Sequence, residues 1–376
     1  MQKEKVYYPS LDILRGLAII LMVQIHFVQN LSPREVGSSW LYDVSMMLGG
    51  IPAPLFSFLL GTSLFIWLQN RRAKGVSDEK ISAVAFRRGA FLFFSGLLFA
   101  VAIWLPREVF NWDILTFLGA STLLLYAMRN LSIRSLLIIL VAVLLISPPL
   151  RELSGYAAHW DPVWEEYLYD FTLPDVLLGF LLQGYFPMLP WIMFPLAGFI
   201  VGKVFFSETG SERKESCLFV WGGILAASSA LLIGLHSRTS GVLAYYASPF
   251  TFYPGSTSFI LGNLGLILIF LGILRRWTDQ KGKTPSGIVY RFLERYSRFS
   301  LTVYIVHHVV HVWPLYVAAL VAGESDPFWF YADAVGTPMA LALAAGFILL
   351  FYPVMGYLQK RKRYTFEGLL RWFSET

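Results

Sequence analysis

Disulfide chemistry is almost absent from this sequence, because its 376 residues include one cysteine, Cys217. A single thiol cannot form a bridge within the chain, and it says little about the compartment. Charged side chains are also scarce: they make up 14% of the residues, against about 25% in a typical soluble domain. We find no low-complexity tract and no segment polar enough to fold as a soluble domain. The sequence therefore excludes a disulfide scaffold and an ordinary soluble enzyme.

Apolar residues make up 56% of the chain and gather in runs long enough to cross a bilayer. Ten such runs lie near residues 12–30, 50–69, 88–105, 113–128, 135–149, 187–206, 217–236, 257–275, 299–321 and 337–358. The first is too long for a signal peptide and lacks a small-residue cleavage site, so we expect it to be retained. This pattern predicts an all-α polytopic membrane bundle of about ten helices in one domain, 1–376. The fourth and fifth runs are the shortest and weakest.

The basic residues follow the rule that cytoplasmic loops hold an excess of Lys and Arg. With the N-terminus inside, all 30 basic residues fall on the cytoplasmic side except Arg34, Arg107, Arg151 and Arg238. The net charge of +6 follows from this topology, so it does not indicate a nucleic-acid partner. We predict a multi-pass protein of the cytoplasmic membrane with both termini inside and the lipid bilayer as its surroundings. The oligomeric state stays open, a homodimer included.

The first apolar run, SLDILRGLAIILMVQIHFVQN at 10–30, has polar residues at its start and a histidine within it. Arg15 and His26 lie eleven residues apart, roughly 16 Å along a helix, which puts His26 near the membrane midplane. An ionisable side chain inside hydrocarbon is a functional-site hypothesis by default. We expect a catalytic or substrate role for His26, with a structural interhelical hydrogen bond as the alternative. Asp12 and Arg15, three apart, can pair on one helix face or simply anchor the helix at the interface.

Three more histidines lie in the ninth run, LTVYIVHHVVHVWPLY. His307 and His311 share a helix face, whereas His308 is turned by about 100° from His307, so we expect at least one to point elsewhere. His307 lies at roughly the depth of His26, and the first and ninth helices run in the same direction, so the two could meet in one polar cavity. The spacing of His307 and His311 also suits a helical metal pair. No neighbouring Glu or Cys completes a familiar motif, a third ligand would have to be His26, and we predict no metal.

Asp113 stands at the predicted outer mouth of the fourth run, after Asn111 and Trp112. It could orient a histidine or bind a substrate, and a helix N-cap is the alternative role.

The longest predicted outer segment, 150–186, is rich in carboxylates and aromatic rings. They are Asp161, Glu165, Glu166, Asp170 and Asp175, with Tyr156, Trp160, Trp164, Tyr167 and Tyr169. Such groups suit sugar binding, because apolar sugar faces stack on rings and hydroxyls donate to carboxylates. An aromatic belt at the membrane interface is the alternative.

Small residues and prolines of the sixth run point to packing rather than chemistry. Gly198 and Gly202 form a small-xxx-small surface that allows close helix approach. Pro187, Pro190 and Pro195 are expected to kink or reshape this span, as is tolerated where backbone borders a cavity.

The run LDILRGLAIILMVQIH resembles the first-helix signature of membrane acyltransferases that use acyl-CoA, with ten residues between its Arg15 and His26. Further segments resemble the heparan-α-glucosaminide N-acetyltransferase catalytic-domain family and its prokaryotic relatives. They are APLFSFLLGTSLFIWL at 53–68, DILTFLG at 113–119, FPMLPWIMFPLAGFIVG at 186–202, SLTVYIVHHVVH at 300–311 and RYTFEGLLRWF at 363–373. The resemblance implies an integral-membrane enzyme that passes acetyl from cytosolic acetyl-CoA to a sugar amine or hydroxyl on the far side, with no tightly bound cofactor.

The chain departs from the family in one place. The active histidine of the lysosomal enzyme lies in the outer loop after the first helix, and the corresponding loop here, LSPREVGSSW at 31–40, contains none. The predicted site residues are therefore of two kinds: catalytic, His26, His307, His311 and Asp113; and coenzyme-binding, Arg15, Arg87 and Arg88. The arginines stand at helix entrances and suit the coenzyme A phosphates, or else act as membrane anchors.

For His26 we predict a general-base role, with a covalent acyl-histidine as the variant. The rival function is a proton-coupled transporter or flippase that uses the histidines to relay protons. Inverted repeats would support that rival, and we find no convincing internal repeat.

Overall fold

The computed structural model describes residues 7–34, 37, 39–104, 108–161, 166–207, 215–279, 285–324, 334–361 and 364–375. These residues form helices and no β-strand; one isolated bridge joins Trp160 to Tyr167. The predicted all-α fold is therefore confirmed. Arg107, Trp164 and Glu165 lie outside the described residues.

Nine helical stretches of the described chain are long and apolar enough to cross a membrane. They are Pro9–Leu31 (α1), Trp40–Ala73, Asp78–Trp104 (α4), Ile133–Leu153 (α6), Leu173–Phe205, Glu215–Arg238, Thr257–Asp279, Ser300–Ala322 (α13) and Thr337–Lys360 (α15). The remaining predicted span, the fourth run, is Ile114–Ala127 (α5), which at 14 residues reaches only about 21 Å. Of the two weak runs, the fifth is thus a full-length helix and the fourth is a short one.

Several of these stretches consist of two or more elements. Their parts are α2 (Trp40–Gly49) and α3 (Pro52–Ala73); α7 (Leu173–Leu178), η3 (Gly179–Gln183), α8 (Met188–Trp191) and α9 (Met193–Phe205); α10 (Glu215–Leu235) and η5 (His236–Arg238); and α11 (Thr257–Leu274) and η7 (Arg275–Asp279). The remaining elements are η2 (Tyr156–His159), η6 (Gly241–Tyr245), α12 (Ile288–Arg298) and α16 (Phe366–Glu375).

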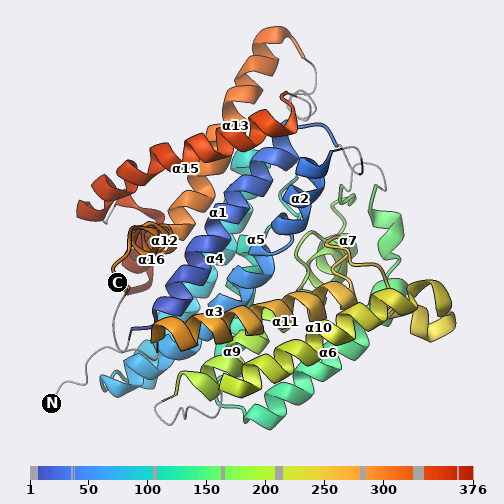
Figure 1. Cartoon of the computed structure of the whole chain (residues 1–376), viewed down its shortest axis with the longest axis vertical. Helices are drawn as coiled ribbons and strands as arrows, with labels where there is room; N and C mark the ends of the chain where they lie inside the picture. The colour runs from blue at the N-terminus through green and yellow to red at the C-terminus, as the bar shows by residue number, and fades with distance from the viewer. Residues whose placement is uncertain are drawn as a thin grey trace.

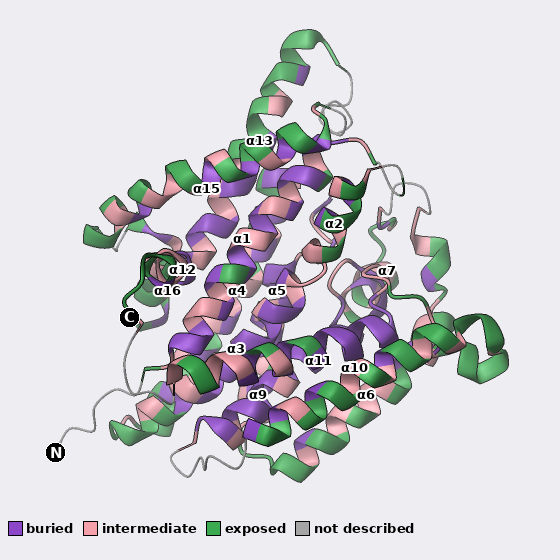
Figure 2. Cartoon of the chain, in the orientation of Figure 1, coloured by how far each residue is buried: buried purple, intermediate pink, exposed green. Residues whose placement is uncertain are grey.

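Helix α1 occupies the middle of the molecule, between α13 and α15 on one side and α9, α10 and α11 on the other (Figure 1). It contacts α2, α3, α11, α12, α13 and α15. Buried residues gather on α1, α9 and α11, whereas α6 and α10 lie at the periphery (Figure 2). In the apolar windows, 56% of α1 is buried, against 17% of α6 and of α10. A lipid environment explains the apolar side chains that the peripheral helices expose.

Helix ends that the predicted topology places on the same side of the membrane lie together in the structure. Three contacts join ends predicted to be cytoplasmic: Ser10 Oγ to Asp279 Oδ2 at 2.6 Å, Arg71 Nη2 to Glu375 Oε1 at 2.6 Å, and Lys203 Nζ to the carbonyl oxygen of Leu131 at 2.7 Å. At the other end, the backbone N–H of Val335 donates to the carbonyl oxygen of Leu31 at 2.9 Å. The bundle therefore has one end rich in basic residues, and its cytoplasmic location stays a prediction.

Helices α3 and α9 pack backbone against backbone through glycines. A Cβ atom added to Gly198 would lie 1.9 Å from the carbonyl oxygen of Phe58, and one added to Gly61 would lie 1.9 Å from that of Pro195. Gly202 continues the seam one turn later. The predicted small-residue surface at Gly198 and Gly202 is confirmed, and α3 supplies a matching glycine.

The proline-rich part of the sixth run is not one continuous helix. Leu189 has φ −107° and ψ 123°, outside the helical region, and a separate helix, α9, follows α8. The residue before a proline is pushed towards extended backbone, which explains the break before Pro190. The expectation that prolines reshape this span is confirmed.

Candidate functional site

His26 of α1 and His307 of α13 meet inside the bundle. The Nδ1 atom of His26 lies 2.9 Å from the Nε2 atom of His307, and the two ring planes are within 5° of parallel. The prediction that histidines at matching depth on these two helices meet is therefore confirmed. Their chemical roles stay predictions.

All three histidines of α13 are buried, with exposed fractions of 0, 2 and 4% for His307, His308 and His311. In each, Nδ1 donates to the carbonyl oxygen four residues earlier: the distances are 2.8 Å for His307, 2.9 Å for His308 and 2.6 Å for His311. These bonds fix each ring along its own helix, so the three Nε2 atoms are presented away from the backbone.

The expectation that one of these histidines points elsewhere was wrong for His308. Its ring centroid lies 4.5 Å from that of His26 and 4.0 Å from that of His307. The Cα–Cβ bond of His308 leaves the helix in a different direction from that of His307. The ring nevertheless folds back to the carbonyl of Tyr304 and packs edge-on against Phe99. This places it beside the first pair, so three imidazoles share one buried space.

For neutral rings, the hydrogen-bond partners assign the tautomers. A carbonyl oxygen can only accept, so the proton of His307 is on Nδ1 and its Nε2 carries a lone pair. His26 must then donate from Nδ1, which leaves the lone pair of His26 on Nε2. By the same argument, Nε2 of His311 accepts from Nδ2 of Asn30 at 2.8 Å. The network thus orients one basic nitrogen of His26.

Asp113 is the N-cap of α5, because its Oδ1 accepts from the backbone N–H of Leu115 at 2.9 Å. Its other oxygen, Oδ2, accepts from the Tyr304 hydroxyl at 2.7 Å. The N-cap alternative is confirmed, and Tyr304 links Asp113 to the histidines, because the carbonyl oxygen of Tyr304 accepts from His308.

Two residues of this site, Asn30 and Tyr304, were missed in the sequence. Asn30 follows His26 by four residues and Tyr304 precedes His308 by four, so each shares a helix face with a predicted histidine. That spacing was the available signal.

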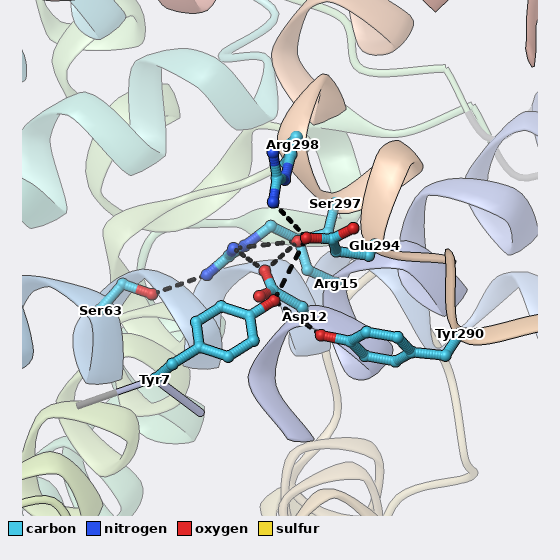
Figure 3. A network of polar contacts seen from close by, with 8 residues as sticks. All are labelled: Tyr7, Asp12, Arg15, Ser63, Tyr290, Glu294, Ser297 and Arg298. Atoms are coloured by element: carbon cyan, nitrogen blue, oxygen red, sulfur yellow. Dashed lines mark hydrogen bonds and ion pairs between the residues drawn. The ribbon is translucent and has the colours of Figure 1, made fainter. Parts of the chain in front are cut away.

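Arg15 lies in a polar network where α1 meets α3 and α12 (Figure 3). Its Nη1 is 3.3 Å from Oδ1 of Asp12 and 3.1 Å from Oγ of Ser297, and its Nη2 donates to Oγ of Ser63 at 2.9 Å. Ser297 Oγ also donates to Asp12 at 2.6 Å. The predicted pairing of Asp12 with Arg15 is confirmed.

The rest of the same network consists of four residues, Tyr7, Tyr290, Glu294 and Arg298 (Figure 3). The hydroxyls of Tyr7 and Tyr290 lie 2.7 Å apart, and Arg298 forms an ion pair with Glu294. This arrangement connects the start of α1 to α12 and holds the guanidinium of Arg15 in a defined place.

Arg88 also lies against α3, one turn from the contact of Arg15. Its guanidinium carbon is 5.0 Å from the ring centroid of Trp67, and its Nη2 is 3.6 Å from Oε1 of Glu375. Arg87, its neighbour on α4, is half-buried. The structure thus brings Arg15 and Arg88 to one helix, and their binding to coenzyme A stays a prediction.

The aromatic residues of the segment 150–186 pack on one another. The ring of Trp160 stacks with Tyr156 at 5.6 Å and with Tyr253 at 5.2 Å, and its Nε1 donates to the carbonyl oxygen of Gln183 at 2.7 Å. Tyr167 stacks with Tyr169 at 5.5 Å. Burial raises the pKa of Tyr169 to about 12, so its hydroxyl stays protonated at neutral pH. These rings already stack on one another, so a sugar would compete with Tyr156 and Tyr253 for stacking on Trp160.

Comparison with known families supports the resemblance seen in the motifs. The family model described as heparan-alpha-glucosaminide N-acetyltransferase, catalytic, matches residues 8–246. The chain belongs to this family. No curated protein matches the chain. Membership in the heparan-α-glucosaminide N-acetyltransferase catalytic family makes the chain a multi-pass membrane protein of an acetyltransferase family.

The family match divides the candidate site. It covers His26, Asp113 and the three arginines, and it ends before α13. The segments at 300–311 and 363–373 therefore fall beyond it. The contacts between His26 and the histidines of α13 are therefore known from the structure and are not covered by the family match.

Proposed function

We propose that the protein transfers an acyl group, in the simplest case acetyl, from cytosolic acyl-CoA to a hydroxyl or amine of a carbohydrate on the opposite side of the membrane. Family membership supports acetyl transfer. The observation that carries the proposal is the contact of His26 Nδ1 with His307 Nε2, because it leaves a lone pair on Nε2 of a histidine placed deep in the bundle.

The chemistry assigned to His26 is general-base catalysis. Its Nε2 accepts the proton of the acceptor's hydroxyl or amine as the acceptor's oxygen or nitrogen attacks the thioester carbonyl. The imidazolium that forms keeps its Nδ1–H donated to His307, which stabilises the positive charge. When the tetrahedral intermediate collapses, the coenzyme A thiolate leaves and takes the proton from Nε2. The histidine is then neutral again.

A covalent route uses the same nitrogen. The Nε2 atom of His26 would attack the thioester, release coenzyme A and hold the acyl group until the acceptor arrives. Release of coenzyme A in a burst without acceptor would distinguish this route from direct transfer.

The donor would enter at the basic end of the bundle. Arg15 and Arg88 both contact α3 there, and guanidinium groups suit phosphate oxygens. Arg15 and His26 are separated by roughly 16 Å along α1. Phosphates held near the arginines would leave the flexible pantetheine arm to carry the thioester up to the histidine.

The substitution His26→Gln tests the proposal. Glutamine keeps a hydrogen-bonding group but is not a base near neutral pH, so we expect a loss of transfer rate on the order of 10²–10⁴-fold with acetyl-CoA binding retained. His236→Gln is the matched control, because His236 lies in η5 and donates instead to the carbonyl of Ala247 at 2.7 Å. Transfer by the His26 variant at nearly the wild-type rate would refute the assignment. If the protein moved a solute across the membrane and neither bound nor hydrolysed acetyl-CoA, the rival function of a transporter would be supported instead.

A further inference from the structure

We propose that the histidine cluster is also a binding site for a transition-metal ion of the Zn²⁺ class, with His26, His307 and His308 as ligands. Each residue offers one ring nitrogen, and the three nitrogens all lie within 4.8 Å of one another. The ligands come from two helices, α1 and α13, so the site exists only in the folded bundle. The sequence pattern predicted no metal here. The i,i+4 pair whose spacing would suit one, His307 and His311, is not the pair in the proposed site, since His308 takes the place of His311.

The distances are close to those that an ion requires. A tetrahedral Zn²⁺ ion with bonds of about 2.0–2.1 Å spaces its ligand atoms by roughly 3.3 Å. The pair His26 Nδ1 and His307 Nε2, now 2.9 Å apart, would widen by about 0.4 Å. The other separations, at most 4.8 Å, would have to close by about 1.5 Å or less.

The surroundings of the ligands also suit a metal. A metal-bound histidine usually donates its other ring N–H to a carbonyl or carboxylate, which fixes the ring. His307 and His308 already donate Nδ1–H to the carbonyls of Val303 and Tyr304. A set of three neutral histidines with an open fourth position is known for Zn²⁺. The Asp113 carboxylate, one hydrogen bond beyond Tyr304, supplies nearby negative charge.

His311 stays outside the ligand set, because its Nε2 already accepts from Asn30. It closes the cluster on the side away from Tyr304. The fourth position of the ion is then left to an exchangeable ligand such as water.

Metal binding would remove the base that the proposed function needs, and this part of the inference rests on that function. The ion takes the place of the proton between His26 and His307. The displaced proton of His26 moves from Nδ1 to Nε2, so the ring stays neutral and no proton is released. The lone pair on Nε2 disappears, and we expect Zn²⁺ to inhibit acyl transfer.

The test uses Co²⁺ as a spectroscopic probe on the full chain in detergent, after treatment with a chelator. Wild-type protein should bind one equivalent of Co²⁺ with visible absorption typical of low coordination number, and Zn²⁺ should displace it. His308→Gln should weaken binding by about 100-fold or more, since even the loss of a residue that only supports a ligand costs 10–100-fold. His159→Gln and His236→Gln are matched controls, because they replace the two of the six histidines that lie outside the cluster, and they should bind Co²⁺ as the wild type does.

X-ray absorption of the Zn²⁺-loaded wild type provides a second readout that needs no variant. It should show three imidazole nitrogens at about 2.0–2.1 Å. Absence of the Co²⁺ bands at millimolar Co²⁺, equal affinity in His308→Gln, or fewer than three imidazoles around Zn²⁺ would overturn the metal site. These outcomes are independent of the proposed function, which the metal-free transfer rate of His26→Gln decides.

Discussion

The close seam between α3 and α9 makes Gly198→Ala a strong test of the structure. The added methyl group would lie 1.9 Å from the carbonyl oxygen of Phe58, whereas ordinary contacts begin at 3.4 Å. The two backbones would therefore have to separate by about 1.5 Å at this point, which is the difference between these two distances. A backbone carbonyl cannot rotate away as a flexible side chain can.

The cost can be worked from two effects. Overpacking in a well-packed interior costs typically about 1–3 kcal/mol. The hydroxyl of Thr62 also donates to the carbonyl of Gly198 at 2.9 Å, and stretching this bond adds about 1 kcal/mol. We expect Gly198→Ala to reduce the free energy of unfolding by about 3 kcal/mol or more. Because α3 also carries Ser63, which binds Arg15, the end of the site where acyl-CoA is proposed to bind should be disturbed as well.

The measurement is unfolding in mixed micelles with increasing dodecyl sulfate, followed by tryptophan fluorescence. Gly223→Ala is the matched control, because a Cβ atom at that position of α10 meets nothing within 4 Å. Alanine has the higher helix propensity, so the control should be neutral or more stable by up to about 1 kcal/mol. If Gly198→Ala unfolds like Gly223→Ala, the two helices do not pack as described.

Three further predictions follow from particular contacts. Arg15→Ala should weaken acetyl-CoA binding about 10–100-fold in calorimetry, because a charged hydrogen bond contributes about 1.5–3 kcal/mol; unchanged affinity, as expected of Arg238→Ala, would make Arg15 only an anchor. Tyr304→Phe should lower the free energy of unfolding by about 1.5–3 kcal/mol, since a buried oxygen of Asp113 loses its donor; a stability equal to wild type in the same micelle assay would contradict this. A reporter fused after Glu375 should be active only in the cytoplasm, and activity on the outer side would rule out the predicted topology.

Much of the fold was predictable because hydropathy and basic residues report directly on membrane crossing. The apolar runs located nearly all the long helices, and depth along the helix was enough to pair His26 with His307. Helix α2 was missed. Its residues Trp40–Gly49 lead directly into α3, and the hydropathy pattern marked only the apolar run at 50–69, which belongs to α3.

The details of the site were less predictable because they depend on side-chain direction. A helical wheel places His308 away from His307 but says nothing of a ring that folds back to a carbonyl one turn earlier. Asp113 appeared as an isolated acid, and only tertiary packing shows that its partner is Tyr304, 191 residues later. Composition likewise could not tell that Trp160 already stacks with Tyr156 and Tyr253.

The long sequence separation between α1 and its polar partners has a consequence for biosynthesis. His26 contacts a residue 281 positions later, and Asp12 one 285 positions later. At about 5–20 residues per second, a ribosome needs roughly 15–60 s to supply them after α1 has been made. During that interval Arg15 already has Asp12 within α1 and can reach Ser63 of α3, whereas His26 lacks His307 and Asp12 lacks Ser297. A chain interrupted before α12 would therefore contain His26 and Asp12 without these two partners.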